Sequence, residues 1–362
     1  MIAGEASGDL HGSNLIKALS KLDHTIDVRC WGGDKMQQVG AHLIKHYRSL
    51  AFMGFAEVVK NLPVILKNIR FCKKDILGYK PDMLILIDYP GFNLRIAKWA
   101  KKQGIKVIYY IAPQVWAWKE NRIKMMKKCI DQMLVILPFE KNYFEDKWKW
   151  SVNYCGHPLL PVLQNLETNK TPLSDKPIIA LLPGSRKQEI QKMLPVMLQV
   201  SKRFPMYQFV VAQAPAQNDE LYQGFLENYP EVLCIKEDTY RLLKQARAAL
   251  VTSGTATLET ALLRVPEIVC YKGSNISYQI AKRLITIKYI SLVNLILDKP
   301  LLTELIQHDF NADTLAESLK DLLTNNTTIQ SLQQGYDELH RSLSTGRNAS
   351  EHAAEVIMQA AN

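Results

Sequence analysis

Short apolar runs alternate with helical segments along the whole chain, and this alternation restricts the fold more than any other feature. In the first half, the runs that predict buried strands are Asp27–Trp31, Met83–Asp88, Val107–Ile111 and Met133–Leu137. In the second half they are Ile178–Leu182, Gln208–Val211, Val232–Ile235, Ala248–Val251 and Glu267–Cys270. Strands that alternate with helices build βαβ units, and these form a parallel sheet with helices on both faces.

The predicted helices lie between and after these runs. They are Gly8–Lys21, Phe92–Gln103, Ser185–Phe204, Tyr240–Gln245, Thr255–Leu263, Ile276–Ile285, Ile329–Ser344 and Asn348–Ala361. A chain of 362 residues exceeds one ordinary α/β core, and the proline-rich, polar stretch Pro158–Pro177 is typical of a linker. We therefore expect two Rossmann-like, doubly wound domains, 1–165 and 176–345, facing each other across a cleft. The sequence leaves open whether the last helix, 346–362, packs back on the first domain.

Charge and cysteine content narrow the class of partner and the compartment. The formal net charge of +10 fits anionic partners such as nucleotide phosphates, nucleic acid or an anionic membrane face, without choosing among them. The six scattered cysteines form no CxxC pair, which predicts reduced core residues in a cytoplasmic protein, with no disulfide framework and no zinc site. We expect no signal peptide and no membrane-spanning segment. The first strand, Met1–Ala3, is short, so either it is stubby or the native start lies upstream.

Two turns in the second half have the composition of anion-binding loops. Leu182–Arg186 (LPGSR) follows an apolar strand and opens a helix, whose N-terminus offers unpaired N–H groups to a phosphate. The alternative interpretation is a plain helix cap with Ser185 as N-cap. Thr252–Glu259 (TSGTATLE) repeats the arrangement, with Glu259 one turn beyond Thr255 and able to bind ribose hydroxyls. Its alternative is an exposed helical glutamate, but two such loops in one domain favour a diphosphate ligand.

Two carboxylate-bearing turns stand out in the first half. Gly4–Asp9 (GEASGD) carries two acids, which disfavours a phosphate and favours a neutral, hydroxylated ligand such as a sugar. The alternative for Asp9 is that it caps the helix that it opens. Asp88 follows the apolar run Met83–Ile87, at the strand end that faces the ligand crevice of an open α/β sheet, and it is a candidate general base. A helix cap is again the alternative.

Aromatic and amphipathic segments remain ambiguous. Trp116 and Trp118 precede a basic helix and predict either a core pair or an aromatic platform beside the site. Phe52–Cys72 and Tyr271–Tyr289 combine apolar residues at helical spacing with lysines and arginines, which is typical of core helices and also of helices that lie on an anionic membrane. We expect Phe52–Cys72 to contribute acceptor or membrane contact.

Taken together, the motifs resemble those of the lipid A disaccharide synthases. The segments GEASGD (Gly4–Asp9), IDYPGFN (Ile87–Asn93), PQVWAW (Pro113–Trp118), LPGSR (Leu182–Arg186), SGTATLE (Ser253–Glu259) and SLVNLI (Ser291–Ile296) occur in that family's order, over essentially the whole chain. LPGSR and SGTATLE are shared in general form by many two-domain glycosyltransferases. GEASGD together with VWAW and the SLVN segment is much more specific to the family.

The resemblance implies a GT-B fold and an inverting glycosyl transfer in lipid A and lipopolysaccharide biosynthesis. The donor would be UDP-2,3-diacylglucosamine and the acceptor 2,3-diacylglucosamine 1-phosphate, giving the β(1→6) disaccharide 1-phosphate and UDP, with no cofactor and no metal. Similar enzymes work at the cytoplasmic face of the inner membrane, peripherally attached, and some form homodimers. No nucleic-acid partner is expected.

The resemblance also implies roles for individual residues. Asp88 would be the catalytic base and Glu5 the reserve candidate. The nucleotide would be bound by Gly184, Ser185, Arg186, Ser253, Gly254, Thr255, Glu259 and Asn294. The chain departs from the family where Gly91 replaces an acid and Val293 a proline, and neither change removes a residue from these roles.

Two other classes of function remain open from the sequence. One is another UDP-sugar enzyme of the same fold, either a peptidoglycan-precursor glycosyltransferase or a UDP-N-acetylglucosamine 2-epimerase. The other is a non-catalytic nucleotide-sugar binder at a membrane.

Overall fold

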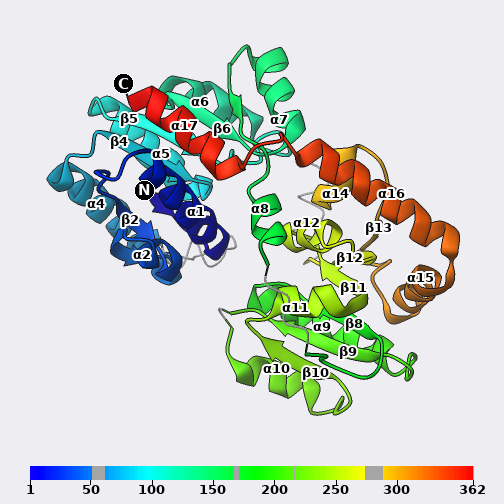
Figure 1. Cartoon of the computed structure of the whole chain (residues 1–362). Coiled ribbons are helices and arrows are strands. Elements are labelled where there is room, and N and C mark those ends of the chain that lie inside the picture. Colours follow the sequence, from blue (N-terminus) through cyan, green and yellow to red (C-terminus); the bar gives the residue numbers. More distant parts are fainter. Residues whose placement is uncertain (51–61, 167–170, 216, 274–287, 362) are drawn as a thin grey trace. The chain divides into compact units, whose positions relative to one another are not determined.

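The computed structural model describes residues 1–50, 62–166, 171–215, 217–273 and 288–361, which form two compact units (Figure 1). Unit 1 comprises Met1–Pro158 with Leu343–Asn362, and unit 2 comprises Leu159–Ser342. The chain thus leaves unit 1 at the first proline of the predicted linker, and its last helix belongs to unit 1.

Unit 1 is built on a seven-stranded parallel sheet with strand order β3-β2-β1-β4-β5-β6-β7. Its strands are β1 (Ile2–Ala3), β2 (Arg29–Gly32), β3 (His42–His46), β4 (Met83–Ile87), β5 (Lys106–Tyr110), β6 (Gln132–Val135) and β7 (Asn153–Tyr154). Its helices are α1 (Ala6–Leu22), α2 (Asp34–Gln38), α4 (Leu62–Tyr79), α5 (Pro90–Lys102), α6 (Ile123–Cys129), α7 (Pro138–Asn142) and α17 (Ala349–Ala361). Helix α1 packs against α2 and α17, whereas α5 packs against α4 and α6.

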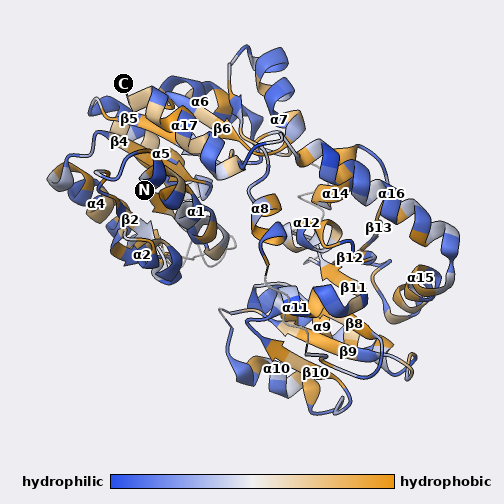
Figure 2. Cartoon of the chain, in the orientation of Figure 1, coloured by the Kyte–Doolittle hydropathy of each residue, from blue (hydrophilic) through white to orange (hydrophobic). Residues whose placement is uncertain are grey.

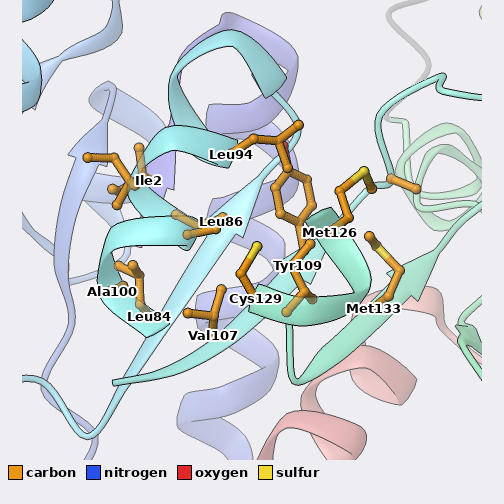
Figure 3. Packing of buried hydrophobic residues seen from close by; sticks show 14 of the residues in the cluster. Ile2, Leu84, Leu86, Leu94, Ala100, Val107, Tyr109, Met126, Cys129 and Met133 are labelled. Carbon is orange, nitrogen blue, oxygen red and sulfur yellow. The ribbon is translucent and has the colours of Figure 1, made fainter. Parts of the chain in front are cut away.

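One hydrophobic core of unit 1 lies between the sheet and the α5–α6 layer (Figure 3). Alternate residues of β4, Leu84 and Leu86, face this layer because side chains alternate across a strand. Leu86 and Val107 have no exposed surface, and burying an aliphatic side chain of this size contributes roughly 1.5–3 kcal/mol. The core therefore holds the middle of the sheet rigid, and with it the loops at its carboxyl edge.

Unit 2 repeats the plan with a six-stranded parallel sheet of order β10-β9-β8-β11-β12-β13. Its strands are β8 (Ile178–Leu182), β9 (Gln208–Gln213), β10 (Leu233–Lys236), β11 (Ala246–Thr252), β12 (Glu267–Tyr271) and β13 (Thr303–Ile306). Its helices are α8 (Leu159–Gln164), α9 (Lys187–Ser201), α10 (Asp219–Leu226), α11 (Thr239–Gln245), α12 (Thr255–Leu262), α14 (Leu292–Leu297), α15 (Ala312–Thr324) and α16 (Asn326–Leu343). Figure 2 shows its hydrophobic residues concentrated in the strands and mostly hydrophilic residues on α16.

Every predicted strand is present to within a few residues, and β1 is as short as its sequence suggested. Sequence reasoning missed β3, β7 and β13. These three are edge strands, each with a single neighbour, so they carry no continuous apolar run; β3 has no fully buried residue. The predicted helix Ile276–Ile285 lies outside the described residues.

Candidate active site

The central strands of unit 1 bring two of the predicted motifs together. Strand β1 lies between β2 and β4, where the order of the strands reverses, and a doubly wound sheet binds ligands at such a point. Ala3 is paired with Ile87, so the residues that follow, Gly4 and Asp88, emerge side by side at the carboxyl edge. Glu5 and Asp88, far apart in sequence, therefore share one site.

Asp88 and Tyr89 have a strained backbone. Their φ angles are +42° and +48°, in the left-handed region that residues other than glycine rarely adopt. The Asp88 carbonyl oxygen accepts hydrogen bonds from Asn93 Nδ2 (2.8 Å) and from the Tyr109 hydroxyl (2.5 Å). These contacts hold the strained turn and direct the loop at the sheet edge, which is the pattern expected where strain serves a function.

The electrostatic environment of Asp88 suits a general base. Burial, and secondarily the negative charge of Glu5, raise the pKa of the Asp88 carboxyl to about 7, against a small opposing contribution from the Tyr89 backbone N–H. A carboxyl whose pKa lies near neutrality can accept a proton and hold it during a reaction. The candidate base identified from strand position therefore also has the proton affinity that this role requires.

The position of the Tyr89 ring leaves no room for a side chain at residue 4, which is Gly4. A Cβ at Gly4 would lie 2.2 Å from the nearest atom of that ring, well inside any permitted contact. The ring is held over the loop because the Tyr89 hydroxyl donates to the carbonyl oxygen of Leu50 (2.7 Å) and the ring stacks on Phe92 at 5.7 Å. The glycine of GEASGD thus allows the Tyr89 side chain to cover the turn beside Asp88.

The prediction that Asp9 caps its own helix is wrong. Asp9 is 3 % exposed, and its carboxylate accepts the backbone N–H groups of Gly33 (2.8 Å), Met36 (3.0 Å) and Lys35 (3.1 Å). It therefore caps α2, a helix about 25 residues further along the chain. The Asp9 carboxylate is thus committed to α2, and Glu5 is the acid of this loop whose charge acts on the Asp88 carboxyl.

Sequence reasoning missed a third carboxyl group, Glu140. Its side chain is 1 % exposed and accepts hydrogen bonds from Trp116 Nε1 (3.1 Å) and from the N–H groups of Leu137 (3.0 Å) and Ile136 (3.2 Å). Burial raises the pKa of the Glu140 carboxyl to about 7, with the charge of Asp88 as a further, smaller cause. Glu140 lies in α7, the helix that follows the carboxyl end of β6, and this position near the same edge of the sheet as Asp88 is the signal that identifies it.

The two tryptophans of PQVWAW have different environments. Trp116 is partly buried and tied to Glu140, whereas Trp118 is 45 % exposed and does not belong to the core. The Lys119 ammonium lies 3.9 Å from the Trp118 ring centroid, a cation–π contact. The interpretation as a core pair is thus wrong for Trp118, which presents an aromatic and basic surface.

The central strands of unit 2 bring the two predicted anion loops together in the same way. Strand β8 lies between β9 and β11, again where the strand order reverses, and Leu182 is paired with Val251. The turns Gly184–Arg186 and Ser253–Thr255 therefore emerge next to each other at the carboxyl edge. Both turns are therefore placed to contact one anionic ligand in unit 2.

The LPGSR turn opens α9, but Ser185 is not its N-cap. The helix begins at Lys187 and its N-cap is Arg186, so the alternative that made Ser185 the cap is wrong. Gly184 has φ +106°, which glycine adopts without strain. Ser185 and Arg186 are both exposed, so the hydroxyl and the guanidinium are accessible to a ligand.

The SGT turn opens α12. Gly254 is the N-cap, and Thr255 is exposed at the first helical position. The Ser253 hydroxyl donates to the carbonyl oxygen of Ile290 (2.8 Å), which anchors the turn. The N–H groups at the start of α12 make this turn the second part of the candidate anion-binding edge of unit 2.

Glu259 is partly buried, so the alternative of an exposed helical glutamate is wrong. Burial raises the pKa of its carboxyl to about 7, although the Tyr240 hydroxyl, which donates to Oε1 at 3.3 Å, lowers it. The hydrogen bond orients the carboxyl on α12, one turn after Thr255. Sequence reasoning missed Tyr240, because nothing in the spacing links α11 to α12.

Asn294 differs from the other predicted nucleotide-binding residues. Its side chain is 1 % exposed, donates to the Leu302 carbonyl oxygen (2.9 Å) and to Glu304 Oε1 (3.0 Å), and accepts the Leu302 N–H (2.8 Å). These bonds tie α14 to the start of β13. The amide therefore acts as a structural tie in this unit, and a contact of Asn294 with nucleotide stays a prediction.

Gln307 is a further polar residue that sequence reasoning did not identify. It follows β13 at the carboxyl edge with φ +55°, and its N–H donates to the Tyr271 carbonyl oxygen at 2.8 Å. The side chain is 6 % exposed, and Nε2 has no acceptor among the described parts of the chain. A buried unpaired donor in a strained position is typical of a functional edge.

Two further observations concern the described residues as a whole. Within them, no group of three or more His, Cys, Asp or Glu side chains is arranged to hold a metal ion. Across the same residue ranges, every helix is too short or too polar to pass through a lipid bilayer.

Solved structures share this architecture over nearly the whole chain. UDP-GlcNAc 2-epimerase from Neisseria meningitidis bound to UDP-GlcNAc matches with a TM-score of 0.69 at 13 % identity, covering 99 % of this chain and 98 % of that one. The glycotransferase of kitacinnamycin matches with a TM-score of 0.66 at 13 % identity, covering 99 % and 97 %. The fold is thus the GT-B type predicted from the sequence, with two parallel-sheet α/β units.

The sequence comparisons define the family within this fold class. The family model for lipid-A-disaccharide synthetase matches residues 1–360. The lipid-A-disaccharide synthase of Coxiella burnetii is 38 % identical over 99 % of this chain and 96 % of the relative, and that of Geobacter metallireducens is 34 % identical over the same shares. Lipid-A-disaccharide synthase 1 of Legionella pneumophila is 36 % identical over 96 % and 93 %. The chain belongs to the lipid-A-disaccharide synthetase family, as its motifs predicted.

Proposed function

We propose that this protein is a lipid A disaccharide synthase. It transfers 2,3-diacylglucosamine from UDP to the 6-hydroxyl of 2,3-diacylglucosamine 1-phosphate, giving the β(1→6) disaccharide 1-phosphate and UDP. Family membership supports this function over the 2-epimerase and peptidoglycan alternatives, because the likeness to epimerases is 13–14 % in identity and extends to the fold alone. The observation that carries the proposed chemistry is the strained, partly buried Asp88 at the strand-order reversal of unit 1.

Unit 2 holds the donor in this proposal. The N–H groups of the LPGSR and SGT turns, together with Arg186, bind the UDP diphosphate. Glu259 accepts hydrogen bonds from the ribose hydroxyls in its ionised form. The same donors stabilise the negative charge that develops on the departing UDP, which removes the need for a metal ion in the transfer.

Unit 1 activates the acceptor. Ionised Asp88 takes the proton of the acceptor 6-hydroxyl as that oxygen attacks the anomeric carbon of the donor sugar, and the bond from this carbon to the UDP oxygen breaks. Attack from the face opposite to UDP inverts the anomeric configuration. Glu5 is the reserve candidate for the base, and its nearby charge otherwise raises the proton affinity of Asp88.

Helix α4 supports attachment to the inner face of the cytoplasmic membrane. Apolar side chains on it that are 43–50 % exposed are Leu62, Val64, Leu66, Phe71 and Leu77. The exposed cations Lys67, Arg70 and Lys74 lie among them. Exposed apolar side chains combined with lysine and arginine are typical of a helix lying in an anionic interface. The predicted segment Phe52–Cys72 overlaps α4, although residues 51–61 lie outside the described residues.

An assay with purified protein tests the transfer. UDP-2,3-diacylglucosamine and 2,3-diacylglucosamine 1-phosphate are supplied in mixed micelles with a chelator, and products are identified by mass spectrometry. We expect the tetra-acyl disaccharide phosphate to form. Asp88→Asn should lower kcat by about 10²–10⁴-fold, as expected for loss of a general base, while UDP affinity is retained. Folded protein that binds UDP but makes no disaccharide would contradict the proposal.

A matched control separates loss of the base from loss of charge. Asp82 is exposed and precedes the opposite, amino end of β4, so Asp82→Asn makes the same chemical change on the same strand away from the site. We expect this variant to retain full activity. Equal losses in both variants would remove the argument for Asp88.

A further inference from the structure

A carboxylate of the chain itself occupies the proposed diphosphate position of unit 2. Glu189 Oε2 accepts the backbone N–H groups of Ser185 and Arg186, both at 3.3 Å, and Oε1 accepts from the Arg186 guanidinium at 2.9 Å. These backbone amides and this guanidinium are the groups that a phosphate would need. Glu189 lies in the first turn of α9, so the side chain folds back over the start of its own helix.

The turn fits closely around this carboxylate. A Cβ at Gly184 would lie 2.7 Å from Glu189 Oε2, so only glycine permits the observed approach. The Glu189 side chain is 25 % exposed and that of Arg186 is 54 % exposed. The arginine can thus be reached by a ligand from solvent, whereas the amides beneath it are covered by the glutamate.

Two anions cannot share these donors. A phosphate oxygen placed on the Ser185 and Arg186 amides would contact the Glu189 carboxylate, and like charges at contact distance repel strongly. We propose that Glu189 occupies a phosphate position in the nucleotide-free enzyme, and that binding of UDP requires this carboxylate to leave Arg186 and the two amides. The inference rests on the proposed nucleotide-binding role of unit 2.

This arrangement has two consequences for the reaction. The Glu189 carboxylate keeps the donors of the turn paired, so the site is formed before the donor arrives. The carboxylate also competes with the nucleotide, which weakens the affinity for UDP and favours its release after transfer. A glutamate that merely capped α9 would have the first effect and not the second.

Glu189→Gln tests the competition because the amide keeps an oxygen acceptor for the helix amides but loses the negative charge. We expect UDP to bind about three- to tenfold more tightly, the range that corresponds to removing an exposed charge interaction from the cradle. Affinity for uridine, which has no phosphate, should stay unchanged. Binding is measured by isothermal titration calorimetry for UDP and by displacement for uridine.

Two further variants make the result decisive. Glu227→Gln removes the same charge from the exposed end of α10 in unit 2 and should leave UDP affinity unchanged, which excludes an effect of net charge. Arg186→Ala should weaken UDP binding. If Arg186→Ala weakens binding while Glu189→Gln leaves it unchanged or weaker, the competition is wrong and Glu189 only orients the arginine. If Arg186→Ala has no effect, the nucleotide site itself is misplaced and both proposals fail.

Discussion

Glu267, at the start of β12, offers a quantitative test of how burial controls the stability of unit 2. Its side chain is 1 % exposed, and neither carboxyl oxygen has a hydrogen-bond donor among the described residues. Burial raises the pKa of this carboxyl well above its ordinary value of 4.5. We predict that Glu267→Met stabilises the protein, because an apolar side chain of similar length replaces an unsatisfied polar group.

The magnitude follows from proton linkage. The folded state keeps a proton that the unfolded state releases above pH 4.5, so the wild type loses stability as the pH rises from 4.5 toward the folded pKa. The slope is about 1.4 kcal/mol per pH unit for as long as the folded group keeps its proton. Removing the unsatisfied carboxyl adds about 1–3 kcal/mol at every pH. The gain from Glu267→Met should therefore grow with pH.

The distribution of tryptophan allows the two units to be followed separately. All six tryptophans lie in the first 150 residues, in unit 1, whereas Glu267 lies in unit 2. Urea unfolding is followed by far-ultraviolet circular dichroism for the whole chain and by tryptophan fluorescence for unit 1, at pH 5.5 and 7.5. Glu267→Gln, which is neutral but still polar, should remove the contribution of this residue to the pH dependence of stability and recover only part of the gain.

Two outcomes would refute this reasoning. An equal gain at the two pH values would mean that Glu267 does not titrate differently on unfolding. A destabilised Glu267→Met protein would mean that the carboxyl is satisfied in solution, by water or otherwise.

The remaining predictions concern the site in unit 1. Because Asp88 must be ionised to act as the base and its pKa is raised to about 7, kcat/KM should fall about tenfold per pH unit below that value, and Glu5→Gln should move the inflection of the pH–rate profile downward. An unchanged inflection in that variant would show that the charge of Glu5 does not affect the pKa of the catalytic base. Gly4→Ala should lower kcat at least about tenfold and cost about 1–3 kcal/mol of stability, because its Cβ would lie 2.2 Å from the Tyr89 ring. Gly91→Ala, where no atom lies within 4 Å, is its control, and equal effects would contradict the steric argument.

Much of the fold was predictable because parallel strands buried on both faces have a direct signature. Runs such as Met83–Ile87 and Ile178–Leu182 are apolar throughout, and their ends locate the loops that carry the site. The edge strands β3, β7 and β13 escaped detection for the converse reason, although the edge strand β10 was predicted. His42–His46 has one neighbouring strand and partly exposed side chains, so its sequence is not continuously apolar.

The sequence by itself determined the family, the two α/β units and the candidates Asp88, Arg186 and Glu259, since these depend on local pattern and on the strand ends. Only the tertiary structure decided how the polar side chains pair. Asp9 caps α2 and not its own helix, and the Asn294 amide is committed to Leu302 and Glu304. Such pairings form when packing brings distant segments together. A buried polar group pairs with whichever donor or acceptor lies within hydrogen-bonding distance, and sequence spacing does not determine that distance.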